Sequence, residues 1–293
     1  MRTAIVLLCV LVALVQVSSA APANANADAT KPDEDTVRVA IIGGMFMTGM
    51  WPKVARMFEE ETGYTVKRVV TGRRGKLAKA LQAGKVDLLT MHSGDITTLQ
   101  VALGYGADMR PWTMNNLVIA GPEDDPAGIK GMEDGAEAFK RIAATESNFI
   151  DFEGIGARET CHRTWHEAGW EHGIPSKPWM LQDKTEDHKQ ILQYAREKNA
   201  YVVVGRAPIM YGKMPSEGME IMVGSDPDMR RPYVAMVANP RRFPESNQEG
   251  ARKLLDFLLS KKVQQFLAEF GTKQYGGVPL FHPVSRYSWT SEE

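Results

Sequence analysis

The first third of the chain alternates strand and helix patterns, and this alternation restricts the fold more than any other feature. Apolar or alternating runs at residues 37–42, 64–70 and 86–91 are typical of strands. Helical patterns lie between them at residues 52–63 and 73–83, each ending at or just before a glycine. Strands that alternate with helices predict a parallel sheet, whose ligands bind in the loops beyond the carboxyl ends of the strands. Those loops are residues 43–49, 71–75 and 92–95.

Length and charge exclude some classes of partner. The chain has 293 residues, of which 43% are hydrophobic and 24% are charged, so it can bury the core of one large domain or of two lobes. Its formal net charge of -1 gives no overall basic field of the kind that holds nucleic acid. We therefore expect no nucleic-acid partner.

The amino terminus has the composition of an export signal. Residues 1–20 carry Arg2 ahead of an apolar run at residues 4–15, and small residues suited to signal-peptidase cleavage follow. The run is shorter than the ~20 apolar residues of an ordinary membrane helix. We expect a periplasmic or secreted protein, and both cleavage of the signal and its retention as an anchor remain open. Residues 21–36 are rich in Ala, Asn, Asp and Pro without a hydrophobic period, which predicts a disordered tether.

A second series of strands and helices follows the first. Residues 116–120 form a short apolar strand that ends at Gly121-Pro122, and residues 132–144 have an amphipathic helical pattern. The remaining expected strands are residues 149–152, 201–204 and 233–238, and the remaining expected helices are residues 158–168, 187–198 and 249–270. The second half of the chain therefore repeats the α/β theme.

The amino-acid sequence of residues 104–131 points to a particular protein family more specifically than its strand and helix pattern does. This stretch contains GYG, RP, NNLVIAGP and DDPAGIKG, and EAFKRIA follows it. These motifs resemble the tungstate-binding proteins of ABC importers, and the resemblance runs from about Val37 to about Pro283. The closing YGGVPLFHP is similar to the terminal signature of that family.

The resemblance implies an α/β chain with the two-lobed periplasmic-binding-protein fold (type II), in which each lobe is a mixed sheet flanked by helices. NNLVIAGP is then the strand that enters the second lobe, and the late segment returns to the first. Lobe I would comprise residues 37–115 and 230–293, and lobe II would comprise residues 116–229.

The resemblance also implies a function. The chain is expected to be an exported solute-binding protein of an ABC-type importer, to need no cofactor and not to be an enzyme. Its ligand would be a tetrahedral oxyanion, tungstate-like or molybdate-like, held between the lobes. Its expected partners are this small inorganic anion and an ABC permease at the membrane, and the protein is expected to be a monomer.

The family's ligand loops can be matched to positions of this chain. The first family loop is a run of hydroxyl residues followed by Ser-Gly; here Gly43 and Gly44 fall in that run, and Thr48 takes the serine position. A Gly-Thr-Gly loop is replaced by Arg73-Arg74-Gly75, and His92 matches a family histidine.

Two later segments carry further cations. Phe152 stands at the position of the family's oxyanion-binding arginine, and Arg158 is a candidate substitute. Asp151 and Glu153 add negative charge nearby, which opposes anion binding. Arg206 matches a later family arginine. The expected ligand-binding residues are therefore Gly43, Gly44, Thr48, Arg73, Arg74, His92, Arg158 and Arg206. Solvated loop arginines and a hydrogen-bonded packing histidine are the alternatives.

Three other interpretations stay open. Cys161, His162 and His166 offer thiolate and imidazole ligands for a soft or borderline metal such as copper or zinc, and the two histidines share one helix face. A cysteine-dependent enzyme would need Cys161 and His162 to act together, but adjacent helix residues point about 100° apart. The third is the same fold binding a different solute. Because Cys161 is the only cysteine after the signal, we expect no internal disulfide.

Overall fold

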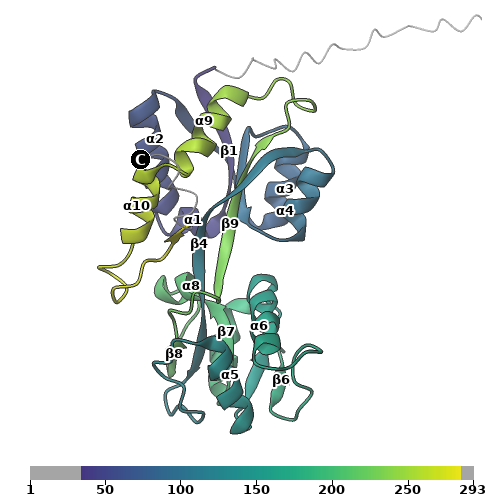
Figure 1. Ribbon diagram of the computed structural model, residues 1–293, viewed down its shortest axis with the longest axis vertical. Coiled ribbons are helices and arrows are strands. Elements are labelled where there is room, and N and C mark those ends of the chain that lie inside the picture. The colour runs from purple at the N-terminus through teal and green to yellow at the C-terminus, as the bar shows by residue number, and fades with distance from the viewer. Residues whose placement is uncertain (1–33, 285–293) are drawn as a thin grey trace, which may run out of the picture. The chain divides into compact units, whose positions relative to one another are not determined.

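A computed structural model describes residues 34–284 of the chain (Figure 1). The expected signal peptide, residues 1–20, lies outside the described residues, as do residues 21–33 of the expected tether and residues 285–293. Within residues 34–284, no helix is long and apolar enough to cross a membrane.

The predicted strand and helix alternation is confirmed in the first third of the chain. Strand β1 (Thr36–Ile42) pairs in parallel with β2 (Thr65–Gly72) and with β3 (Leu88–His92). Helix α2 (Met50–Thr62) connects β1 to β2 and ends at Gly63, whose φ of 76° is the left-handed conformation that glycine adopts most readily. Helix α3 (Arg74–Gln82) connects β2 to β3.

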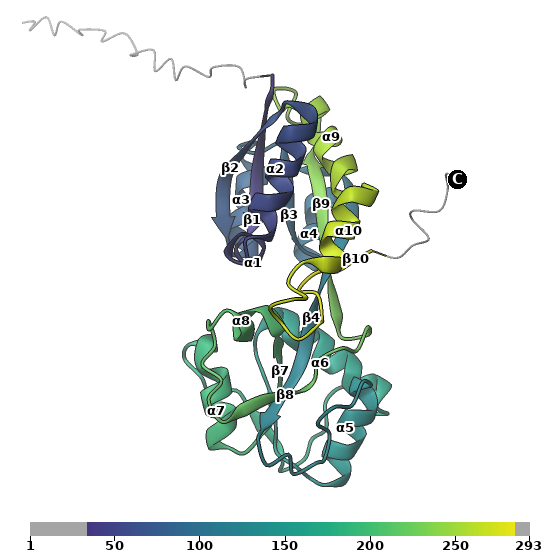
Figure 2. The same cartoon turned by 90° about the vertical axis from the view of Figure 1, so that its left-hand side faces the viewer.

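The loop expected at residues 43–49 instead begins with a short helix, α1 (Gly43–Met47). Its two leading glycines have poor intrinsic helix propensity and hide the helical pattern in the sequence. The loop that follows β3 leads into α4 (Asp95–Ala102). Helices α2, α9 and α10 cover one face of this part of the sheet, and α3 and α4 cover the other (Figures 1 and 2).

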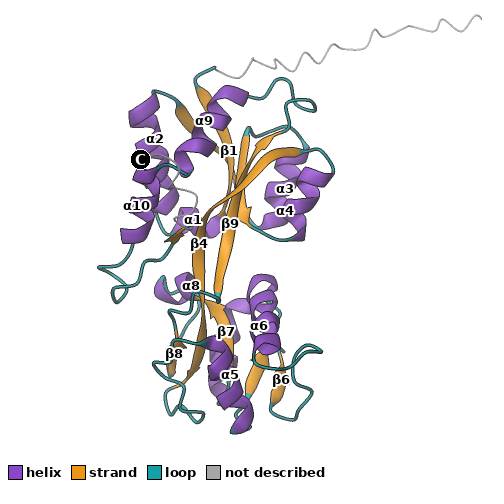
Figure 3. Cartoon of the chain, in the orientation of Figure 1, coloured by secondary structure: helices purple, strands orange, loops and turns teal. Residues whose placement is uncertain are grey.

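Two long antiparallel strands connect the two halves of the sheet. The strand order is β2-β1-β3-β9-β4-β7-β5-β6, with β8 and β10 also paired to β4. Strand β4 (Gly106–Pro122) has 17 residues and β9 (Arg230–Ala238) has 9. Both run further than the apolar segments predicted from the sequence, and Figure 3 shows β4 continuing through both halves. The mixed sheet flanked by helices agrees with the expected α/β class.

The remaining elements build the second half of the sheet and return to the first. They are α5 (Gly135–Ala144), β5 (Phe149–Asp151), α6 (Ile155–Glu167), β6 (Met180–Gln182), the 3-10 turn η1 (His188–Gln190), α7 (Ile191–Glu197), β7 (Tyr201–Gly205), α8 (Arg206–Met210), β8 (Met219–Val223), α9 (Gln248–Leu258), α10 (Lys261–Glu269) and β10 (His282–Pro283). Strand β5 pairs in parallel with β6 and β7.

Buried apolar side chains form two separate clusters. One contains Trp51 and Trp112, whose rings meet edge to face with centroids 6.2 Å apart. The other contains Phe139, Phe149 and Trp165, with the Phe139 and Trp165 centroids 4.3 Å apart. Aromatic pairs of this kind contribute beyond the area they bury. Each half of the sheet is therefore stabilised by its own core.

Candidate functional site

A cavity of about 820 Å³ lies at the carboxyl ends of β2 and β3, where ligand loops are expected for parallel strands. Its lining residues come from the ends of strands, from the N-terminal turns of helices and from the loops between them, and they are far apart in the sequence. They are Ile42, Arg73, Arg74, Gly75, His92, Gly94, Asp95, Ile96, Gly156, Glu159, His188 and Arg231. Of the expected ligand-binding residues, the cavity brings together Arg73, Arg74 and His92.

Helices α3, α4 and α6 begin at this cavity. Their N-cap residues are Arg73 for α3, Gly94 for α4 and Gly154 for α6. In α3 and α6 no side chain caps the first amides, whereas in α4 the Thr97 hydroxyl accepts a hydrogen bond from the amide of Gly94. Free amide groups and the positive end of the helix dipole favour anions at such positions. The backbone around the cavity is therefore suited to a negatively charged ligand.

Three arginines line the cavity: Arg73, Arg74 and Arg231. Among residues 34–284 none of them forms an ion pair with a carboxylate. Arg231 donates a long hydrogen bond, 3.4 Å, to the carbonyl of Ser93. Its Nε is buried and has no hydrogen-bond partner among residues 34–284. Burial and the neighbouring Arg74 lower the pKa of Arg231 to about 10, so it stays charged at neutral pH.

Arg231 was missed by the sequence reasoning. It lies at the start of a buried strand rather than in a loop that follows one. The cross-strand register pairs it with Asn115 of β4, and this pairing directs both side chains to one face of the sheet. The double arginine at 230–231 ahead of an apolar strand was the only signal available in the sequence.

Two glycines make room for the arginines. A Cβ added at Gly156 would collide with the guanidinium of Arg231, and a Cβ at Gly94 would lie 3.1 Å from Nη1 of Arg74. Gly94 also has a φ of 144°, which other residues rarely adopt. Glycine at these two positions therefore permits the guanidiniums to pack closely against the backbone.

His92 lines the cavity and also packs within the fold. Its ring stacks on Tyr233 with centroids 4.0 Å apart. Burial, helped by the charges of Arg231 and Arg74, holds the pKa of His92 well below 6.5. The imidazole is therefore neutral at neutral pH, and one of its nitrogens can donate a hydrogen bond without adding charge.

The other expected residues lie around the cavity in different roles. Gly43 and Gly44 open α1 directly after Ile42, which lines the cavity. Thr48 is buried, and its hydroxyl donates to the carbonyl of Met45 at 3.2 Å. Arg206 is 8% exposed and donates to the carbonyls of Gly224 at 3.3 Å and Tyr275 at 2.8 Å.

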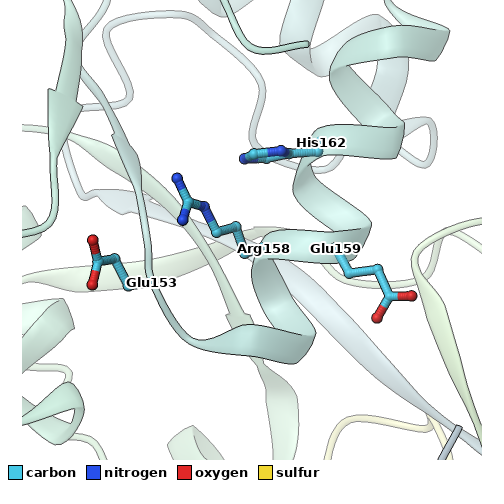
Figure 4. Close-up of a pocket in the computed structure, with 4 residues that line it drawn as sticks. All are labelled: Glu153, Arg158, Glu159 and His162. Atoms are coloured by element: carbon cyan, nitrogen blue, oxygen red, sulfur yellow. The ribbon is translucent and has the colours of Figure 1, made fainter. Parts of the chain in front are cut away.

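Arg158 is bound to a buried carboxylate. It donates two hydrogen bonds to Asp151, at 2.6 and 3.3 Å, and Nε2 of His162 lies 3.0 Å from the same carboxylate. Arg158 and His162 line a second cavity of about 570 Å³ together with Glu153 and Glu159 (Figure 4). Phe152, at the position of the family's oxyanion-binding arginine, is buried and packs edge to face on His188.

The interpretations based on Cys161 are not supported. Burial, aided by the charge of Asp151, raises the pKa of the Cys161 thiol well above 9.0, which disfavours the thiolate that a metal or a substrate would need. His162 is engaged with Asp151, and His166 is exposed. Between residues 34 and 284, no group of three or more His, Cys, Asp or Glu side chains is arranged to hold a metal ion.

Comparison with known proteins places the chain in a family. Residues 37–273 match the family model described as bacterial extracellular solute-binding protein. The tungstate-binding protein TupA of Peptoclostridium acidaminophilum is 29% identical over 234 residues, which span 77% of this chain and 78% of that protein.

Solved structures give the same result for the fold. The tungstate-binding protein TupA from Desulfovibrio alaskensis superposes with a TM-score of 0.70 and 26% identity, covering 85% of this chain and 99% of the other. The tungstate ABC transporter structure from Geobacter sulfurreducens, at 24% identity, has a TM-score of 0.63 and covers 81% of this chain and 99% of its own. The expected periplasmic-binding-protein fold is confirmed by these structures. The match of its model to most of the chain shows that this protein belongs to the bacterial extracellular solute-binding proteins.

Proposed function

We propose that this chain is the solute-binding component of an ABC-type importer and that it binds a tetrahedral oxyanion in the cavity lined by Arg73, Arg74 and Arg231. The observation that carries the proposal is the gathering of three guanidiniums, none of them ion-paired to a carboxylate within residues 34–284, beside uncapped helix N-termini. Guanidiniums and backbone amides are the groups that proteins most often use to bind oxyanions. The names of the tungstate-binding relatives support the same class of ligand.

Each expected ligand-binding residue has a role in this proposal. Arg73, Arg74, Arg231 and His92 contact the anion, and Gly43 and Gly44 leave backbone amides near it. Thr48, Arg158 and Arg206 already have protein partners and instead support the surrounding walls.

We further propose two lobes, of which lobe I comprises residues 37–115 and 230–293 and lobe II comprises residues 116–229. The two separate apolar clusters support this division. Export through the segment at residues 1–20, a monomeric state and delivery of the anion to a membrane permease complete the proposal.

Binding measured by calorimetry on the purified protein tests the proposal. Tungstate, molybdate, sulfate, phosphate and arsenate would be titrated separately at one pH and ionic strength, and the melting temperature would be followed in parallel. A ligand that binds only the folded state at 100 times its Kd stabilises that state by about 2.7 kcal/mol. We expect at least one of the five anions to bind and to raise the melting temperature. Binding by none of them would overturn the proposal.

The size of the cavity favours one further candidate. Its volume of about 820 Å³ lies in the range of roughly 300–1,000 Å³ typical of pockets for small molecules. A larger solute that carries an anionic group, bound through the same arginines, is therefore the second candidate.

A further inference from the structure

We propose that Glu159 makes this cavity select an oxyanion that still carries a proton, of the monohydrogen phosphate and arsenate class, over fully deprotonated sulfate, molybdate or tungstate. This inference rests on the proposed function, because it concerns which anion the same site accepts.

The position of Glu159 is the first step. It lies on α6 and lines the same cavity as Arg74 and Arg231. Figure 4 shows its side chain pointing away from Arg158 and His162, toward the other side of the helix. Glu159 is exposed and lines both the cavity of the three arginines and the second cavity, which Arg158 and His162 also line.

The carboxylate is free to act on a ligand. Within residues 34–284 it forms no hydrogen bond or ion pair, in contrast to Asp151, which binds both Arg158 and His162. Its negative charge nevertheless acts on Arg231, whose pKa it raises against the larger effect of burial. Glu159 thus lines the same cavity as the arginines and interacts electrostatically with Arg231.

The second acidic residue of the lining has an explanation within the fold. Asp95 is the first residue of α4, where a carboxylate is stabilised by the helix dipole. Glu159 is the fifth residue of α6 and lies beyond the first turn. Within residues 34–284, Glu159 therefore has neither a position in the first turn of its helix nor a protein partner for its carboxylate.

The chemistry of hydrogen bonding supplies the selection. An ionised carboxylate only accepts hydrogen bonds, and each oxygen of a fully deprotonated oxyanion also only accepts them. The two groups therefore repel each other. Monohydrogen phosphate presents charged oxygens to the arginines and one O–H to Glu159, which turns the repulsion into a charge-assisted hydrogen bond. A hydrogen bond to a charged group corresponds to about 10- to 100-fold in affinity.

Calorimetry on the purified full chain and two variants tests the inference. The probes are sodium phosphate, arsenate, sulfate, molybdate and tungstate at one pH near neutrality and one ionic strength. In the natural sequence we expect phosphate and arsenate to bind at least about tenfold more tightly than the other three. In Glu159→Gln the carboxamide can donate, so we expect phosphate to weaken, sulfate and tungstate to tighten, and the preference to disappear or invert.

Glu153→Gln is the matched control. Glu153 is exposed and lines the second cavity with Glu159, but it does not line the cavity of the three arginines. The charge change is the same, and we expect the anion preference to stay unchanged. The melting temperature of each variant without ligand confirms that it is folded.

The outcomes separate this inference from the function on which it rests. If tungstate or sulfate binds the natural sequence as tightly as phosphate does, or if Glu159→Gln keeps the preference for phosphate, the inference is wrong while anion binding stands. An equal shift in Glu153→Gln would attribute the effect to net charge and would also overturn the inference. If none of the five anions binds, the proposed function fails and the inference fails with it.

Discussion

Gly156 on α6 lies directly against the guanidinium of Arg231 on β9, so closely that a Cβ at position 156 would collide with the arginine. The contact connects an element of the second half of the sheet to one of the two strands that cross between the halves. A side chain at position 156 would therefore displace the Arg231 guanidinium from its place in the cavity lining.

The first prediction concerns this contact. Gly156→Ala should weaken binding of the preferred anion by at least about tenfold, because the guanidinium must leave its position and charge-assisted hydrogen bonds are lost. Helix α6 itself should not suffer, since Ala has a higher helix propensity than Gly by about 1 kcal/mol. Calorimetry and thermal unfolding would measure the two effects separately.

Gly75→Ala is the control for that prediction. Gly75 lines the same cavity near the start of α3, but a Cβ there meets no heavy atom within 4 Å. We expect its affinity to change by less than about threefold, well under one hydrogen bond to a charged group. Equal losses in the two variants would show that any added methyl group harms binding and would contradict the specific role of the Gly156 contact.

A second prediction separates binding from stability at Arg231. Burial lowers the pKa of Arg231, which means that its charge is disfavoured in the folded state. Arg231→Met should therefore stabilise the ligand-free protein by about 1–3 kcal/mol, as replacing buried charges with apolar residues often does. The same variant should lose most of its anion affinity. Urea unfolding and calorimetry would measure the two quantities.

Arg241→Met provides the comparison for Arg231. Arg241 is exposed and lies outside the cavity lining. Its replacement should change neither stability nor affinity measurably. If Arg231→Met destabilises the ligand-free protein, the prediction is wrong, and interactions of Arg231 within the folded protein outweigh the cost of burying its charge.

The sequence predicted the elements whose pattern is local. Strand β1 and the parallel pairing of β1 with β2 and β3 follow from apolar runs separated by helical patterns. The first half of β4 was missed because Asp108, Arg110 and Pro111 interrupt its alternation. Register shifts in the pairing of β4 with β9 accommodate these residues, and Asp108 adopts a φ of 49°. Only the cross-strand partner reveals that this segment is a strand.

The candidate site was predicted in part for a related reason. Arg73 and Arg74 come directly after β2, and His92 is the last residue of β3, so the parallel-sheet rule located them. Arg231 and Glu159 reach the cavity from a crossing strand and from the second turn of a helix. Their positions depend on long-range register and on packing of α6, which no local pattern in the sequence specifies.

A third prediction assigns Asp151 to stability rather than to binding. The carboxylate is buried and accepts hydrogen bonds from Arg158 while contacting His162. Asp151→Asn should reduce the free energy of unfolding by about 1–3 kcal/mol, since a charge-assisted pair is lost from a buried position. We expect anion affinity to change less than about threefold, because Arg158 lies outside the cavity of the three arginines. A loss of affinity larger than tenfold would contradict this prediction and would show that Arg158 contributes to anion binding.

The last prediction concerns the pH dependence of stability through His282. The imidazole is 6% exposed, and its Nε2 has no hydrogen-bond partner within residues 34–284. Burial, with the charges of Arg230 and Arg206, lowers its pKa from 6.5 to about 4. Between these values the unfolded chain binds a proton that the folded protein does not, so stability rises with pH in this window.

The stabilising contribution of neutral His282 is therefore complete above pH 6.5 and is lost as the pH falls toward 4. The gap between the two pKa values corresponds to about 3 kcal/mol of unfolding free energy, which is lost in full only when His282 is protonated in both the folded and the unfolded state. His92 also has a lowered pKa and contributes a slope of the same sign. Urea unfolding of the natural sequence and of His282→Gln from pH 4.5 to 7.5 isolates the share of His282, because Gln does not titrate. We expect the unfolding free energy of the natural sequence, minus that of the variant, to decrease as the pH falls. A constant difference across this range would show that His282 keeps its ordinary pKa in the folded protein.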